Sequence, residues 1–345
     1  MRYYGNKTKL LEFIYTNISS LKISEKKTIF DLFSGTSAVS NYFKEKGYQV
    51  ISNDWLFFCY AIAVAKVEIN HEPKFLKIKN KLKIKTIDEL FDYLNNIPDK
   101  IDFITKNYTP YKKSIRQYFS ESNGKKIDAI RSSIEEWYET KIINKKEKCY
   151  LISSLLFAVN KVSNVTGTYG SFLKKWDSRA LKKMVLEPVE IINSKYQNIV
   201  LNENAIDVVD KFDVDILYLD PPYNSRQYIS NYFILEIIAE GWFGDNLPKI
   251  YGHTGMCSYE SKKSTFSSKA NALNSFKELI SKAKSKFIVL SYNEEGIIPH
   301  DDIKKILSAK GNLSIKQFNH KRYRSINQDG SHSKTTEFLF IVEVK

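Results

Sequence analysis

Short apolar runs that end at polar or small residues are the main pattern in this chain. Residues 28–30 form one such run, which stops at Asp31 and a turn of small residues. Residues 39–43 then have the spacing of a helix, which we expect to end near Gly47. Residues 48–54 form a second run that closes on an acidic residue. This order of strand, turn, helix and strand predicts a parallel βαβ unit.

Three further apolar runs predict the rest of the sheet. Residues 215–219 and 287–293 have the composition of buried strands, and residues 338–342 that of a last strand, at a sheet edge or antiparallel to its neighbour. Between the first unit and residue 215 the chain is rich in lysine and mostly helical in pattern, most clearly over 127–138 and 148–162. We therefore predict an α/β fold whose sheet domain, 1–59 and 196–345, is interrupted by a mostly helical insertion, 60–195.

A near-alternating series of lysines over residues 74–85 has two explanations. It fits a basic strand that faces phosphates, or an edge strand that its lysines protect from pairing with other chains. We favour the edge strand.

Composition narrows the class of protein. The chain has 345 residues, of which 43% are hydrophobic and 27% charged, as in a soluble globular protein. Its apolar runs are shorter than a membrane span, and we recognise no cleavable signal at the start, so we expect no membrane association and a cytoplasmic location. The three cysteines and five histidines are widely spaced, so we expect neither a disulfide framework nor a metal site.

The net charge of +14 favours a polyanionic partner such as nucleic acid. Lysine is also a common solvated surface charge, so the charge alone does not decide the class of partner.

The segment Asp220-Pro221-Pro222-Tyr223 is the most informative in the chain. Two prolines cannot continue a strand, so the chain leaves the sheet directly after residues 215–219. Asp220 and Tyr223 therefore lie at the carboxyl end of a strand, where open α/β sheets bind ligands. A carboxylate and an aromatic ring on a stiff turn suit a flat heterocycle that carries an amino group.

The first strand-to-helix turn contains Asp31, Phe33, Gly35 and Ser37. It has one glycine, whereas a dinucleotide fingerprint has three, and Asp31 would repel a pyrophosphate. A ligand with an ammonium and a sulfonium group, such as S-adenosylmethionine (SAM), suits this acidic turn. Asp54 closes the second strand at the spacing of an acid that binds ribose hydroxyls.

Together these motifs resemble the adenine-specific DNA methyltransferases that modify N6, in the motif order of the alpha group and most closely the FokI-type class of restriction-modification methyltransferases. The resemblance implies a Rossmann-like SAM-dependent methyltransferase sheet with an inserted DNA-recognition domain. It assigns roles residue by residue. The residues implied in cofactor binding are Tyr3, Gly5, Lys7, Asp31, Phe33, Gly35, Ser37, Asp54 and Asp220, and those implied in catalysis are Asp220, Pro221, Pro222 and Tyr223.

Two positions depart from the family pattern. Ser37 stands where a second glycine is usual, and it is small enough to be tolerated. Asn204 aligns with an acid near the adenine ring of the cofactor, and its carbonyl oxygen can still accept from an exocyclic amino group.

The implied chemistry is methyl transfer to an adenine that has flipped out of a duplex. Asp220 and the Pro221 carbonyl would accept from the two hydrogens of N6, and Tyr223 would stack on the base. A C5-cytosine enzyme would need a nucleophilic cysteine in that class's motif, and no cysteine here follows a proline.

The insertion should bind and recognise double-stranded DNA. Residues 164–176 are the best candidate contact loop, with Asn164, Tyr169 and Lys174 as its contacts, and Arg226 is a further candidate. The alternative for this loop is a packed hairpin.

Two other functions stay open on the sequence alone. One is an RNA adenine methyltransferase, and the other is a non-enzymatic DNA-binding specificity subunit on the same fold. A restriction-modification system also implies a cognate endonuclease for the same site and, if the site is asymmetric, a second methylase for the other strand.

Overall fold

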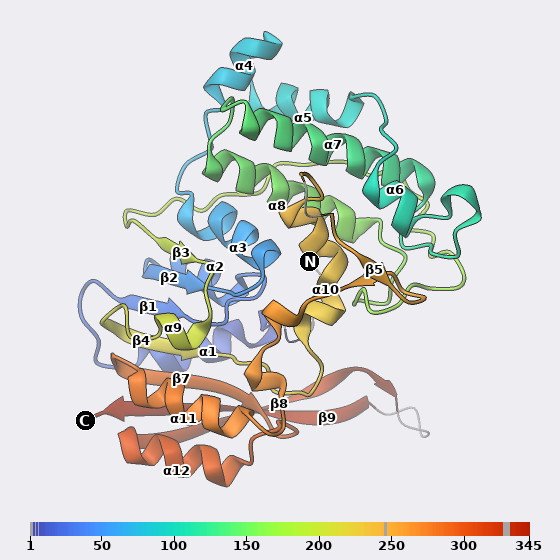
Figure 1. The fold of residues 1–345 in the computed structure, drawn as a ribbon. Helices are drawn as coiled ribbons and strands as arrows, with labels where there is room; N and C mark the ends of the chain where they lie inside the picture. Colours follow the sequence, from blue (N-terminus) through green and yellow to red (C-terminus); the bar gives the residue numbers. More distant parts are fainter. Residues whose placement is uncertain (1–2, 4, 6, 245–246, 327–331) are drawn as a thin grey trace. The chain divides into compact units, whose positions relative to one another are not determined.

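The computed structural model describes residues 3, 5, 7–244, 247–326 and 332–345. They form two compact units (Figure 1). The sheet unit contains Lys7–Trp55, Ser194–Gln227 and Lys263–Lys345. The helical unit contains Leu56–Asn193 and Tyr228–Lys262, together with Tyr3 and Gly5. The segment Tyr228–Lys262, which the predicted boundaries place in the sheet domain, thus groups with the helical unit.

In the described part of the sheet unit, seven strands form one sheet in the order β3-β2-β1-β4-β7-β9-β8. The strands from β3 to β7 are parallel, and β9 is antiparallel to both β7 and β8. Their bounds are β1 (Thr28–Asp31), β2 (Gln49–Asn53), β3 (Ile199–Leu201), β4 (Val214–Leu219), β7 (Ser285–Asn293), β8 (Gly311–Ile326) and β9 (His332–Val344). The predicted α/β class and the five predicted strands are confirmed, and β3 and β8 are additional.

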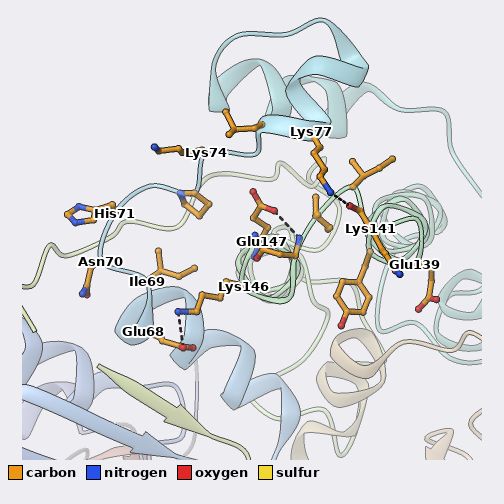
Figure 2. Close-up of a pocket in the computed structure, with 16 residues that line it drawn as sticks. Glu68, Ile69, Asn70, His71, Lys74, Lys77, Glu139, Lys141, Lys146 and Glu147 are labelled. Carbon is orange, nitrogen blue, oxygen red and sulfur yellow. Dashed lines mark hydrogen bonds and ion pairs between the residues drawn. The ribbon is translucent and has the colours of Figure 1, made fainter. Parts of the chain in front are cut away.

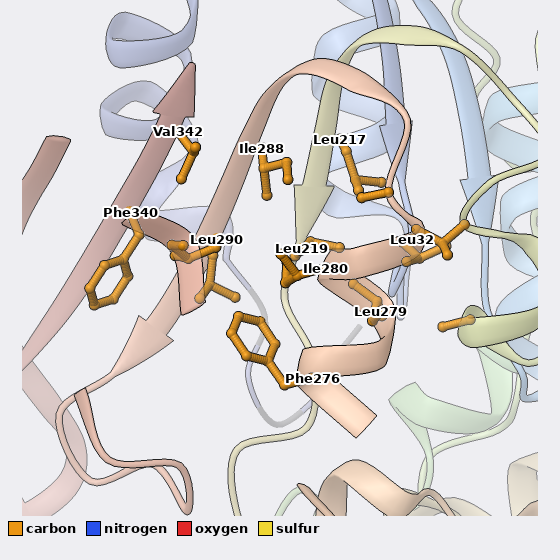
Figure 3. Close-up of a cluster of buried hydrophobic side chains, with 14 of the residues drawn as sticks. Leu32, Leu217, Leu219, Phe276, Leu279, Ile280, Ile288, Leu290, Phe340 and Val342 are labelled. Atoms are coloured by element: carbon orange, nitrogen blue, oxygen red, sulfur yellow. The ribbon is translucent and has the colours of Figure 1, made fainter. Parts of the chain in front are cut away.

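Helices cover this sheet because its strands are apolar on both faces. Phe276, Leu279 and Ile280 of α11 pack on Leu217 and Ile288 of the central strands (Figure 3). Burying each of these side chains stabilises the fold by roughly 1.5–3 kcal/mol. The helices are η1 (Thr8–Leu10), α1 (Leu11–Ser19), α2 (Ala38–Glu45), α9 (Ala205–Val208), η5 (Thr265–Ser267), α11 (Ala272–Lys282) and α12 (His300–Lys310).

The strand order reverses between β1 and β4. From β1 the chain continues to β2 on one side, while β4 lies on the other side with Asp31 paired to Tyr218. The carboxyl ends of β1 and β4 therefore diverge at a topological switch point, the place where open α/β sheets bind ligands.

Most of the helical unit consists of helices, with one short hairpin. The elements are α3 (Phe57–Ala63), the π-helix η2 (Val64–Glu68), α4 (Leu76–Leu82), α5 (Ile87–Asn96), α6 (Phe103–Tyr108), η3 (Tyr111–Lys113), α7 (Glu121–Glu139), α8 (Lys145–Lys161), α10 (Tyr228–Glu240), β5 (Ile250–Tyr251), β6 (Met256–Cys257) and η4 (Glu260–Lys262). The two predicted helices of the insertion correspond to α7 and α8.

The prediction of an edge strand over residues 74–85 is wrong, because this segment contains the helix α4. Phe75 and Ile78 are buried and Leu82 is half-buried, so the apolar positions have helical spacing of three and four. The lysines between them lie mostly on the exposed side. Within the described residues, no helix is long and apolar enough to cross a membrane.

Candidate active site

The turn between β1 and α2 is built around a buried carboxylate. Asp31 is 1% exposed, and its Oδ2 accepts hydrogen bonds from the Ser40 hydroxyl at 2.6 Å and the Ser40 amide at 3.2 Å. Ser37 has a left-handed backbone (φ 60°), which costs a non-glycine residue about 1 kcal/mol and accounts for the glycine expected there. Gly35 is also left-handed (φ 51°).

Several polar atoms in this turn lack hydrogen-bond partners. Among the described residues, Asp31 Oδ1 and the hydroxyls of Ser34 and Ser37 are buried without one. The pKa of Asp31 is raised to about 7, first by burial and then by the charges of Asp220 and Asp54, against the hydrogen bonds of Ser40, which lower it. Buried polar groups normally have partners, so this turn fits a ligand that brings donors and positive charge.

Asp54, which follows β2, and Asn204, which follows β3, lie at this same edge of the sheet. Asp54 Oδ2 accepts from the Gly35 amide at 2.8 Å, which fixes the turn against the end of β2. Asn204 caps α9, and its Oδ1 accepts from the Ile206 amide at 3.1 Å. Asn53, for which no role was predicted, donates to the carbonyls of Leu32 and Glu203, each at 3.1 Å.

Asp220 follows the fully buried strand β4, as predicted. The turn after it is held by the Tyr223 carbonyl, which accepts from the Ile297 amide at 2.9 Å. The Tyr223 ring meets Tyr292 edge-on with centroids 6.2 Å apart. Pro221 is buried, and Pro222 and Tyr223 are half-buried. The turn is therefore anchored at its backbone while its ring keeps an accessible surface. Phe33, in the neighbouring β1–α2 turn, packs edge-on against Phe266.

A buried lysine joins the turn over residues 220–223 to the last strand, β9. Lys7 is 5% exposed, and its Nζ lies 3.2 Å from Asp220 Oδ1 and in closer contact with Glu337. Burial would lower the pKa of Lys7, but the charges of Asp220 and Glu337 raise it well above its ordinary value. We call these three residues the sheet cluster. The sequence suggested Lys7 and Asp220, whereas the role of Glu337 depends on pairing between strands that sequence spacing does not show.

Tyr3 and Gly5 belong to the helical unit. Tyr3 stacks on Tyr232 with ring centroids 4.6 Å apart and meets Phe58 edge-on. Gly5 has a left-handed backbone (φ 79°).

The predicted contact loop has buried and exposed members. Asn164 is fully buried, donates to the carbonyls of Gln117 and Leu173 at 3.0 Å, and accepts from the Asp177 amide at 2.9 Å. Tyr169 is also fully buried, and its amide donates to the Asn231 carbonyl. These two side chains hold the loop in shape, while Lys174 is exposed. Arg226, in the sheet unit, is exposed as well.

A separate pocket lies within the helical unit, between η2, α4 and the neighbouring ends of α7 and α8 (Figure 2). Two of its lysines already have partners: Lys146 is paired with Glu68 at 3.0 Å, and Lys77 donates to the Lys141 carbonyl at 3.0 Å. None of the predicted site residues lines it.

A carboxylate at the switch point, an acidic turn beside it and a parallel sheet beneath define a nucleotide- or cofactor-binding α/β enzyme. A family model for the D12 class of N6 adenine-specific DNA methyltransferases matches residues 3–306. The chain belongs to this family, which confirms the resemblance found in the sequence.

Named relatives agree with the family. Type II methyltransferase M.FokI from Planomicrobium okeanokoites is 40% identical over 99% of this chain, and modification methylase StsI from Streptococcus sanguinis is 38% identical over 100% of it. The chain spans about half of each of these proteins, 52% in both cases. It spans 99% of type II methyltransferase M.NlaIII from Neisseria lactamica, at 36% identity.

Proposed function

We propose that this chain is a SAM-dependent methyltransferase that modifies N6 of an adenine flipped out of double-stranded DNA, as the modification methylase of a restriction-modification system in the cytoplasm. The observation that supports this most strongly is the position of Asp220, which follows β4 at the switch point, faces the buried Lys7 ammonium and neighbours the acidic β1–α2 turn. Family membership agrees with this chemistry.

The β1–α2 turn fits the methionine end of SAM. The unpartnered Asp31 Oδ1 would accept from its ammonium, and the Ser34 and Ser37 hydroxyls are further partners. Gly35 lets the backbone come close, and Asp54 would bind the ribose hydroxyls. Asn204 is assigned to the adenine ring of the cofactor, and Lys7 and Phe33 to the walls of this site, while the cofactor roles of Tyr3 and Gly5 stay predictions from the family resemblance. The bound cofactor supplies an electrophilic methyl group on a sulfonium.

The catalytic turn orients the target base. Adenine N6 is a poor nucleophile because its lone pair is delocalised into the ring. Hydrogen bonds from its two hydrogens to Asp220 and to the Pro221 carbonyl favour a tetrahedral nitrogen whose lone pair points at the methyl group. Orientation of this kind lowers a barrier by several kcal/mol, up to roughly ten. Stacking on Tyr223 adds on the order of 1–3 kcal/mol.

We assign DNA contacts to the exposed Lys174 and Arg226, and we assign to the buried Asn164 and Tyr169 the task of shaping the contact loop. We further propose that the insertion over residues 60–195, with the segment Tyr228–Lys262 that packs with it, recognises the target sequence. A cognate endonuclease and a second methylase for the opposite strand are the proposed protein partners.

Transfer of labelled methyl groups from SAM tests this function. We expect labelling of unmethylated duplex DNA and not of ribosomal RNA, with N6-methyladenine as the product. Preferential labelling of RNA would favour the RNA enzyme. Absence of SAM binding in calorimetry, with DNA binding intact, would favour the non-enzymatic subunit.

A further inference from the structure

Strand β9, which pairs with the last parallel strand, β7, carries a buried carboxylate outside the catalytic turn. Glu337 is 5% exposed and lies opposite Asn293 of β7. Because β9 runs antiparallel to β7, its first half lies at the same sheet edge as the carboxyl ends of β4 and β7. The residues that follow, 338–342, are apolar, so a carboxylate at this depth needs a specific reason.

Three donors converge on Glu337. The Lys7 ammonium and the Ser291 hydroxyl (2.8 Å) contact Oε1, and the Asn293 amide lies 3.4 Å from Oε2. Burial alone would raise the pKa of Glu337, but the charge and hydrogen bond of Lys7, helped by Ser291 and Asn293, lower it. Glu337 is therefore a stable carboxylate at neutral pH.

One ammonium thus serves two carboxylates. Its contact with Glu337 is closer than its 3.2 Å contact with Asp220 Oδ1. The pKa of Asp220 is raised to about 7, because burial and the charge of Glu337 raise it more than Lys7 lowers it. The titratable groups that face this cluster from the packed elements are Tyr218 of β4, Tyr223 of the turn and Asp31 of β1.

We propose that Glu337 is a positioning residue for methyl transfer: it anchors the Lys7 ammonium beside Asp220 and neutralises most of its charge, which leaves Asp220 able to take up a proton. This inference depends on the proposed transfer to adenine N6, because it concerns the proton that this reaction releases.

The proton balance explains why such a residue is useful. As N6 bonds to the methyl carbon, the carbon–sulfur bond breaks and its electron pair stays on sulfur. N6 then carries a positive charge and loses one of its two hydrogens as a proton. The carboxylate of Asp220, which accepts a hydrogen bond from that N–H, takes the proton and releases it to water at the 16% of its side chain that is exposed. A lysine paired with Asp220 alone would make this carboxylate a poorer proton acceptor.

The variant Glu337→Gln tests the proposal, with Glu343→Gln as the matched control on the same strand, where Glu343 is exposed. Two quantities are measured: the titration midpoint of the Asp220 carboxyl carbon by NMR of the protein alone, and the acid limb of the pH profile of kcat. For Glu337→Gln we expect both to move to lower pH by about one unit or more, because Lys7 then acts on Asp220 alone. For Glu343→Gln we expect neither to move.

Three further variants keep the test decisive. Lys7→Gln should move the Asp220 midpoint to higher pH, and the double variant Lys7→Gln/Glu337→Gln should lie between the two single variants. If Glu337→Gln does not fold, Glu337→Asp, whose carboxylate is withdrawn from Lys7 by one methylene, should give a smaller shift in the same direction.

An unchanged Asp220 midpoint in every folded Glu337 variant would overturn the proposal. Failure of the proposed function looks different: the wild-type protein would then transfer no methyl group to DNA, whatever the Asp220 midpoint.

Discussion

The sheet unit and the helical unit each hold one lysine between two carboxylates, yet the two clusters are built differently. The sheet cluster consists of Lys7, Asp220 and Glu337. A second group, which we call the helical cluster, consists of Lys262, Glu236 and Glu240. Both contain a nearly buried carboxylate in close contact with an ammonium.

Glu337 resembles Glu236 in having several donors, so the difference between the clusters lies between Glu236 and Asp220. Glu236 Oε1 accepts from the Phe57 amide and Oε2 from the Phe58 amide, both at 2.9 Å, in addition to Lys262. Glu236 lies on α10, and its carboxylate thereby accepts from backbone amides in the first turn of α3 that have no acceptor within that helix. Asp220, by contrast, has the Lys7 ammonium as its one partner among the described residues.

A carboxylate whose oxygens all accept from protein donors stabilises the structure. A carboxylate at a strand end that still has unused acceptor capacity is available to bind a ligand. A lysine between two carboxylates thus serves packing in one unit and, as we propose, chemistry in the other. Four substitutions test this contrast, here ordered by the size of the expected effect.

Asp220→Ala should have the largest effect, which is on activity. We expect the rate of methyl transfer to fall by about a thousandfold or more, because the acceptor that orients N6 is lost. Stabilisation of the protein by SAM in thermal unfolding should persist, since the β1–α2 turn is intact. Transfer at the wild-type rate would show that Asp220 is not the catalytic carboxylate.

Glu236→Ala should affect stability and leave the chemistry unchanged. Two backbone amides and Lys262 would lose their acceptor, so we expect the free energy of unfolding in urea to fall by about 2–4 kcal/mol. The pH profile of kcat in the folded fraction should match that of the wild type. A shifted profile would remove the distinction between the two clusters.

Asp220→Asn should stabilise the fold in a pH-dependent way. The pKa of Asp220 rises from 3.8 to about 7 on folding, so ionising it costs stability as the pH increases through this window. We expect the variant to gain up to about 4 kcal/mol over the wild type at about pH 8, and nothing at about pH 4. A gain that is equal at both pH values would contradict the raised pKa.

Glu240→Gln should have the smallest effect. The Glu240 side chain is 48% exposed, and solvent-exposed ion pairs contribute little. We expect a change in unfolding free energy below about 0.5 kcal/mol. A loss comparable with that of Glu236→Ala would show that the helical cluster acts as one unit.

Much of the sheet could be predicted because its signals are local. The strands before Asp31, Asp54 and Asp220 are short apolar runs that stop at an acid or a proline, so both sequence and structure place these carboxylates at strand ends. The prediction of a strand over residues 74–85 was wrong because alternating lysines have the period of a strand. The burial of Phe75 and Ile78 instead follows the period of a helix.

What the sequence could not show depends on long-range pairing. Glu337 meets Lys7 across 330 positions of the chain, and nothing in the local pattern of β9 indicates that contact. Asn164 and Tyr169 have the composition of a contact loop, but their burial depends on partners such as Gln117 and Asn231 that lie far away in sequence.

Sequencing single molecules of plasmid DNA from cells that produce the wild-type chain or Asp220→Ala is the most direct measurement. The proposed function requires N6-methyladenine at one short sequence context in the wild-type sample and its absence in the Asp220→Ala sample. Methylation of cytosine, or N6-methyladenine that persists in the Asp220→Ala sample, would contradict the assignment of Asp220 as the residue that holds the target base.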